Sequence, residues 1–178
     1  CARERTGKGQ MVDISMADGV VGLLAGIPGA TEYPYSGILP KRAETLTSGN
    51  NPFYAVYQTK DGKYVSICPI EPRFWQNLCR AIGREDLVPH EFAPSPKKEE
   101  VLAELRKIFL TKTRDEWFET LVQADVPIGK VLDLDEVFKD PQILARQMIL
   151  DVSHPKFGGI PQIGVSIKLS DTPGEVRS

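Results

Sequence analysis

The sequence has few of the residues that build metal sites, disulfide frameworks and membrane spans. Its 178 residues include two histidines and three cysteines. Cys1, Cys68 and Cys79 form no Cys-X-X-Cys pair, so we expect neither a metal site nor a disulfide framework. A reducing cytoplasmic setting is expected for the same reason. The longest apolar stretch, residues 20–27, contains glycines and is far shorter than the roughly 20 residues that span a bilayer. No membrane partner is expected.

Charge and motifs exclude further classes of protein. The 22 basic and 24 acidic residues are interspersed, with a formal net charge of −2, so no broad cationic surface exists for nucleic acid. The sequence contains no P-loop, dinucleotide fingerprint, nucleophile elbow, HExxH or EF-hand pattern. With 41% hydrophobic and 26% charged residues, the composition is that of an ordinary globular protein.

The first 27 residues are typical of one edge of an α/β unit. Residues 11–15 alternate apolar and polar side chains and predict a strand, and residues 16–24 predict a helix. The sequence opens in a basic polar run at Cys1, so we expect it to be cut from a longer protein. Residues 28–51, rich in glycine and proline, predict a long linker.

A hairpin and several helices are predicted next. Residues 53–59 and 63–68 flank Asp61-Gly62, a pairing that favours a tight turn with positive φ. Helices are then expected after Pro72, after Ser95-Pro96 and after Thr113.

The C-terminal part predicts shorter elements. Residues 126–132 and 149–152 favour strands, and Asp133 and Asp140 favour the N-caps of two helices. We therefore expect an α+β small domain, a hairpin plus several helices, with flanking pieces of a doubly wound α/β large domain. The predicted division is large-domain end 1–27, linker 28–51, small α+β domain 52–153 and return linker 154–178.

One candidate site is a polar loop before the hairpin. Ser48, Gly49, Asn50 and Asn51 directly precede a predicted strand. The backbone N–H groups of such a loop can bind an oxyanion or a phosphate. The alternative is an ordinary connecting turn.

The second candidate is Glu71, which stands between Ile70 and the helix start at Pro72. Its carboxylate could point into a cleft and orient an imidazole. The alternative is an N-terminal helix cap, which the helix dipole favours.

The two histidines and the two internal cysteines are expected to occupy ordinary structural positions. His90 and His154 lie in turn-like sequence and are interpreted as solvated loop residues. Cys68 and Cys79 fall on apolar faces of a strand and a helix, where a thiol is usually a packing residue.

Several blocks together resemble the class III CoA-transferase and α-methylacyl-CoA racemase superfamily, in the same order and over nearly the whole chain. These blocks are residues 6–16, 51–54, 57–64, 70–75, 125–127, 140–142 and 169–174.

The resemblance implies a fold and a chemistry. In that superfamily a large doubly wound α/β domain is joined by long linkers to a small α+β domain, and two subunits interlock as a homodimer. Coenzyme A thioesters are substrates, and no bound cofactor or metal is expected. In the transferases an upstream aspartate accepts the acyl group, whereas the racemases use an upstream histidine and aspartate to move the proton α to the thioester.

Two positions of the superfamily fall within this chain. The loop Ser48-Gly49-Asn50-Asn51 looks like the place of the glycine-rich loop that covers intermediates in formyl-CoA transferases, although one glycine remains here. Glu71, in its Ile-Glu-Pro context, matches the glutamate that supports the catalytic histidine of the racemases.

The expected activity is transfer of coenzyme A between an acyl-CoA and a carboxylic acid. Epimerisation of a 2-methylacyl-CoA is the second candidate, and a non-catalytic binding or dimerisation module is the candidate from another class. The principal catalytic Asp and His are expected upstream, so the 178-residue chain alone is predicted to be inactive.

Overall fold

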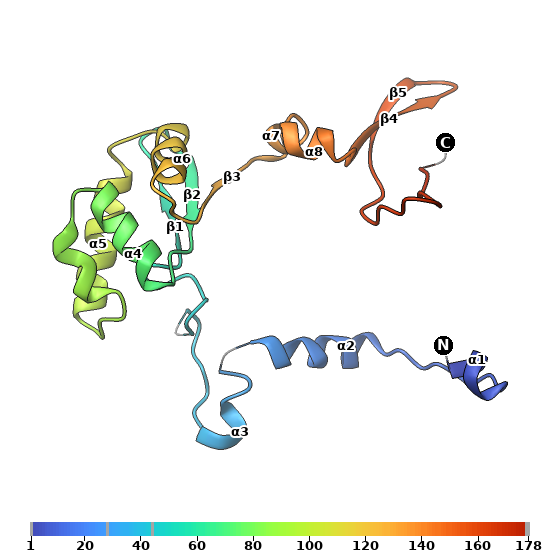
Figure 1. Ribbon diagram of the computed structural model, residues 1–178, viewed down its shortest axis with the longest axis horizontal. Helices are drawn as coiled ribbons and strands as arrows, with labels where there is room; N and C mark the ends of the chain where they lie inside the picture. The colour runs from blue at the N-terminus through green and yellow to red at the C-terminus, as the bar shows by residue number, and fades with distance from the viewer. Residues whose placement is uncertain (1, 28, 44, 177–178) are drawn as a thin grey trace. The chain divides into compact units, whose positions relative to one another are not determined.

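The computed structural model describes residues 2–27, 29–43 and 45–176 (Figure 1). The chain divides into two units, one ending at Gly129 and one beginning at Lys130. The small antiparallel sheets and the helices confirm a mixed α+β fold. The domain boundaries predicted from the sequence remain predictions.

Short helices dominate the first part of the chain. They are α1 (Ala2–Thr6), α2 (Met16–Leu23), the 3-10 helix η1 (Leu24–Gly26) and α3 (Tyr33–Ser36). The helix predicted over 16–24 is confirmed, and the Ser15 side chain caps it by accepting a hydrogen bond from the Asp18 backbone N–H. The predicted linker holds one short helix, α3; Pro28 and Glu44 of that linker lie outside the described residues.

The strand predicted over residues 11–15 is wrong. These residues lie in no strand, and the sheets of the described chain offer them no pairing partner. An alternating pattern forms a stable strand only where another strand satisfies its backbone groups. The apolar side chains that made the pattern are uncovered, with Met11 and Met16 each 89% exposed.

A three-stranded sheet organises the first unit. Strands β1 (Ala55–Gln58) and β2 (Tyr64–Ile67) pair antiparallel, with Ala55 opposite Ile67 and Gln58 opposite Tyr64. Strand β3 (Ile128–Val131), whose first two residues end this unit, lies on the other side of β2. The predicted hairpin is confirmed. Gly62 at its turn has φ +76°, a conformation that favours glycine.

Helices pack on one face of this sheet. Helix α5 (Lys97–Phe109) contacts β1 and α6 (Arg114–Gln123) contacts β2, and α4 (Pro72–Ala81) and the 3-10 helix η2 (Glu85–His90) pack beside them. The capping box of Thr113 and Glu116 forms as predicted. His90, expected in a loop, ends η2 instead, because a six-residue 3-10 helix containing Pro89 has too little periodicity to predict it.

The core lies between the sheet and these helices. Tyr57 and Val65 are buried on the helix-facing side, and the Tyr57 ring stacks on Phe109 with centroids 4.6 Å apart. The Phe109 ring in turn contacts Trp117 at 5.0 Å. Because side chains alternate along a strand, the opposite face of the sheet remains open.

Polar contacts fasten the hairpin to its surroundings. The buried Tyr57 hydroxyl donates to the Pro52 carbonyl at 2.8 Å. At the turn, the Asp61 carboxylate accepts hydrogen bonds from the Thr59 hydroxyl and, at 3.2 Å, from the Arg114 backbone N–H at the start of α6. The turn is thereby tied to a helix far along the chain.

The second unit contains α7 (Leu134–Val137), α8 (Pro141–Ala145) and the antiparallel hairpin of β4 (Ile149–His154) and β5 (Gly158–Ile163). Asp133 and Asp140 occupy N-cap positions, as predicted. His154 was expected in a loop but ends β4, where its ring stacks on Phe157 at 5.0 Å. Among the described residues, no helix is long and apolar enough to cross a membrane.

Replacing Tyr57 with phenylalanine should lower the free energy of unfolding by about 1–2 kcal/mol, because the ring contact with Phe109 survives while the buried Pro52 carbonyl loses its donor. Urea unfolding followed by tryptophan fluorescence measures the change. Tyr64→Phe, on the open face and 42% exposed, is the matched control. Equal effects of the two changes would contradict this role for the Tyr57 hydroxyl.

Asp61 should make stability depend on pH. The hydrogen bond from Thr59, followed by that from the Arg114 N–H, lowers the pKa of Asp61 below its usual value. A carboxyl whose pKa is lower in the folded state stabilises the fold above its unfolded pKa, and this contribution disappears as the pH falls through the folded pKa. Asp61→Asn preserves a favourable turn residue, so it should lower the Tm by a few degrees at pH 7 and by less near pH 3. A difference from wild type that is constant over this pH range would exclude the charge as the cause.

Candidate functional site

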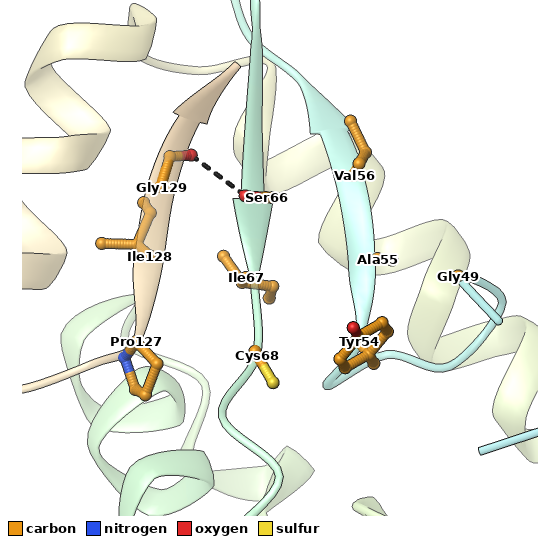
Figure 2. Close-up of a pocket in the computed structure, with 10 residues that line it drawn as sticks. All are labelled: Gly49, Tyr54, Ala55, Val56, Ser66, Ile67, Cys68, Pro127, Ile128 and Gly129. Atoms are coloured by element: carbon orange, nitrogen blue, oxygen red, sulfur yellow. Dashed lines mark hydrogen bonds between the residues drawn. The ribbon is translucent and has the colours of Figure 1, made fainter. Parts of the chain in front are cut away.

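The open face of the three-stranded sheet carries a hollow with a volume of about 520 Å³ (Figure 2). Its lining comes from β1, β2 and the start of β3, from the neighbouring residues Tyr54, Cys68 and Pro127, and from Gly49 in the preceding loop. We call it the sheet hollow. Figure 2 shows the three strands side by side, with the Gly49 loop beyond β1.

Backbone pairing and one small residue shape the floor of the sheet hollow. The Cys68 backbone N–H donates to the Pro127 carbonyl at 3.0 Å, and the Ser66 hydroxyl donates to the Gly129 carbonyl at 3.4 Å. A Cβ at Gly129 would lie 3.1 Å from the Ser66 Oγ. Glycine at this position therefore lets β3 lie close against the Ser66 side chain.

The predicted loop meets the sheet hollow at one residue. Gly49 has φ +88° and lines the hollow, so its backbone is presented with no side chain over it. The Ser48 hydroxyl and the Asn51 amide instead donate to the carbonyls of Thr45 and Leu46, at 2.7 and 2.8 Å. Ser48 and Asn51 hold the shape of the loop, whereas Asn50 is not part of the lining.

Glu71 is not part of the lining of the sheet hollow but follows the lining residue Cys68 by three positions. It occupies the N-cap position of α4 with extended backbone, but its side chain makes no capping hydrogen bond. The pKa of Cys68 is raised by burial and, secondarily, by the negative charge of Glu71. Since Cys68 lines the sheet hollow, the Glu71 charge acts at its edge. The missing cap bond leaves the carboxylate available for other partners.

The position of Cys68 differs from the one predicted from the sequence. It was expected in the core, but it is half-buried and lines the sheet hollow. The period of two along a strand places position 68 on the same face as Ser66, which is the signal that sequence reasoning missed. Cys79 is buried as expected, and burial, with the charges of Asp86 and Glu91, raises its pKa to about 12.

The lining of the sheet hollow is mostly apolar. Its polar side-chain groups are the hydroxyls of Tyr54 and Ser66 and the Cys68 thiol, whose pKa is raised, so the lining holds no activated thiolate and no carboxylate or imidazole base. Neither His90 nor His154 lines it. Within residues 2–27, 29–43 and 45–176, no group of histidine, cysteine or acidic side chains is arranged to hold a metal ion.

Sequence comparison assigns the chain to a family. Residues 1–178 match CoA-transferase family III, and the chain belongs to this family. It is 32% identical to formyl-CoA:oxalate CoA-transferase of Streptomyces coelicolor, over 99% of this chain and 47% of that protein. It is 31% identical to succinyl-CoA–D-citramalate CoA-transferase of Chloroflexus aurantiacus, over 98% of this chain and 44% of that protein.

Solved structures agree with this family. A CAIB/BAIF family protein from Brucella suis matches with a TM-score of 0.70 and 29% identity, over 97% of this chain and 44% of that one. Rv3272 from Mycobacterium tuberculosis matches with a TM-score of 0.71 and 25% identity, over 98% and 45%. The chain therefore spans slightly under half the length of the relatives it matches.

The thiol of Cys68 should report the charge of Glu71. Because burial and that charge raise its pKa, Cys68 should react with iodoacetamide at pH 8 more slowly than free cysteine, and Glu71→Gln should accelerate the reaction about twofold or more. Peptide mass spectrometry separates Cys68 from the other cysteines. Glu85→Gln, at the exposed start of η2, is the control. An unchanged rate in Glu71→Gln would place the Glu71 charge away from the sheet hollow.

Proposed function

We propose that the protein containing this chain transfers coenzyme A between an acyl-CoA and a carboxylic acid. The observation that carries the proposal is the alignment of the chain, over 98–99% of its length, with transferases named for formyl-CoA and oxalate and for succinyl-CoA and D-citramalate. The proposal covers the reaction class and leaves the acyl group and the acceptor acid open.

In this proposal the chain supplies a binding surface. The sheet hollow combines apolar walls with the bare backbone of Gly49. A surface of this kind could lie over a bound thioester or acyl intermediate and contact it. The attacking carboxylate would come from the aspartate that the family resemblance places upstream of this chain. That aspartate would take the acyl group as a mixed anhydride while coenzyme A leaves as the thiolate. The thiolate would then attack the aspartyl carbonyl of the anhydride, which releases the donor carboxylate and leaves a coenzyme A thioester on the aspartate. The acceptor carboxylate would attack this thioester to form a second anhydride, and the thiolate released would attack its acceptor acyl carbon, which forms the new acyl-CoA and frees the aspartate.

The architecture of the intact protein is part of the same proposal. Residues 1–27 would complete a large α/β domain, and two subunits would interlock as a homodimer. The uncovered side chains of Met11, Ile14 and Met16 support this proposal, because apolar groups with such exposure need a packing partner. The chain alone would then lack turnover.

One observation favours a second candidate, a 2-methylacyl-CoA racemase. Glu71 follows Ile70 and precedes Pro72, the context of the glutamate that supports the racemase histidine, and its side chain is not used as a helix cap. A histidine oriented by Glu71 would move the proton α to the thioester. A non-catalytic binding or dimerisation module is the third candidate, since the lining of the sheet hollow offers no catalytic group of its own.

Proton exchange separates these candidates. The protein, expressed at the full length that its gene encodes, is incubated with a 2-methylacyl-CoA in deuterated water without an acceptor acid. We expect no deuterium at the α carbon by mass spectrometry. In a second assay with formyl-CoA or succinyl-CoA as the donor, we expect coenzyme A transfer once oxalate, succinate or citramalate is added. Under transfer conditions Glu71→Gln should change kcat by less than about tenfold, because Glu71 has no role in anhydride chemistry.

Two results would reverse these assignments. Deuterium uptake with loss of stereochemistry, abolished in Glu71→Gln, would establish the racemase and make Glu71 the support of its base. Absence of both exchange and transfer across these acids, while acyl-CoA still binds, would favour the binding module.

A further inference from the structure

The sheet hollow extends across all three strands of the sheet. Its lining includes Val56 on β1, Ser66 on β2 and Gly129 on β3, and Figure 2 shows these residues on neighbouring strands. Neighbouring strands lie about 4.8 Å apart, so the hollow is about 10 Å across. An extended chain advances roughly 1.2 Å per bond, so about six to eight carbons would cross this width.

The surface of the sheet hollow is apolar where an occupant would meet it. Val56 projects from the open face and is 57% exposed, and Pro127 adds a second apolar side chain. The half-buried Cys68 thiol behaves as a small apolar group. The Ser66 hydroxyl already donates to the Gly129 carbonyl. Covering such a surface with an apolar group removes it from water, which favours binding.

Charge decides which occupants the sheet hollow accepts. The described residues that line it include no charged side chain. A carboxylate placed there would lose its water and find no cation in exchange, which is costly. The Glu71 charge raises the pKa of Cys68, as a smaller cause than burial, so this end of the hollow is also unfavourable to an anion.

The substrates of the proposed reaction differ in how well they suit such a surface. Coenzyme A carries phosphates at one end, and the acceptor acid carries a carboxylate. The acyl chain of the donor is the part that can be both long and uncharged. It therefore matches the width, the apolar surface and the lack of charge of the sheet hollow.

We propose that the sheet hollow receives the acyl chain of the substrate, an apolar chain of about six to eight carbons, and selects against an acyl group that ends in a second carboxylate. This inference rests on the proposed function, because it takes the substrate to be an acyl-CoA. Formyl-CoA and succinyl-CoA, for which two relatives are named, would then be slower donors here. The first is too short to cross the hollow, and the second brings a carboxylate to it.

The test compares three donors on the protein at the full length that its gene encodes. Hexanoyl-CoA and adipyl-CoA have the same number of acyl carbons, but adipyl-CoA ends in a carboxylate, and acetyl-CoA is the short donor. kcat/KM is measured with one fixed acceptor acid. The Kd of each thioester and of free coenzyme A is measured by calorimetry without an acceptor.

Two lysine variants locate the chain. Val56→Lys adds a cation to the lining, and Gln58→Lys adds the same cation two residues along the same face of β1, outside the lining. Both positions are exposed, so both variants should keep the fold. Thermal unfolding checks this.

We expect the wild type to prefer hexanoyl-CoA to both other donors by about tenfold or more, since each buried methylene strengthens binding by about fourfold and the carboxylate finds no partner. Val56→Lys should raise adipyl-CoA relative to hexanoyl-CoA by about tenfold, because the carboxylate then gains a cation. Gln58→Lys should change this ratio by less than about twofold.

Three results would overturn the inference. They are a wild type that prefers adipyl-CoA or treats acetyl-CoA and hexanoyl-CoA alike, a Val56→Lys variant with an unchanged ratio, and a Val56→Lys variant that changes the Kd of free coenzyme A as much as that of hexanoyl-CoA. The last result would assign the hollow to coenzyme A itself.

Failure of the inference differs from failure of the proposed function. Transfer without any preference for chain type would retain the transferase and overturn the acyl site. The expected preference in Kd, with its response to Val56→Lys but without transfer to any acid, would support the acyl site and overturn the transfer reaction.

Discussion

The structure of the first unit depends on the asymmetry of its three-stranded sheet. One face carries Tyr57 and Val65 into the aromatic core around Phe109, and burial of these side chains fixes the register of the strands, since a slip of one residue would turn them to solvent. The same register sends Ser66 and Cys68 to the opposite face. The packing of one face therefore determines which groups line the sheet hollow on the other.

Polar contacts hold this arrangement in place around the sheet hollow. The Tyr57 hydroxyl and the Asp61 carboxylate fasten both ends of the β1–β2 hairpin, one to Pro52 and one to the start of α6. Because Pro52 directly follows the loop that contains Gly49, the hydroxyl contact also anchors the end of that loop. Hydrogen bonds of Ser48 and Asn51 within the loop hold the rest of it. Gly49 reaches the sheet hollow as a consequence of these contacts.

Local signals in the sequence predicted most of the elements, because the physical causes of those elements are local. The Asp61-Gly62 turn, the Thr113–Glu116 capping box and the N-cap at Asp140 each depend on neighbouring residues and were predicted correctly. The strand at 11–15 failed because pairing depends on a distant partner, which the pattern itself does not contain. The exposure of Cys68 and the burial of Glu91 were missed for a related reason: both depend on tertiary neighbours, although strand periodicity held the clue for Cys68.

Glu71 acts electrostatically on two groups that lie in different places. Its negative charge raises the pKa of Cys68, which lines the sheet hollow, and of Glu91, which follows η2, in each case as a smaller cause than burial. Removal of that charge would ease ionisation of both groups, so a change of activity in a Glu71 variant would not by itself reveal which group is responsible. The thiol of Cys68 and the carboxyl of Glu91 can be titrated separately. Their separate responses allow the effect of Glu71 on the sheet hollow to be distinguished from its effect on the buried carboxyl of Glu91.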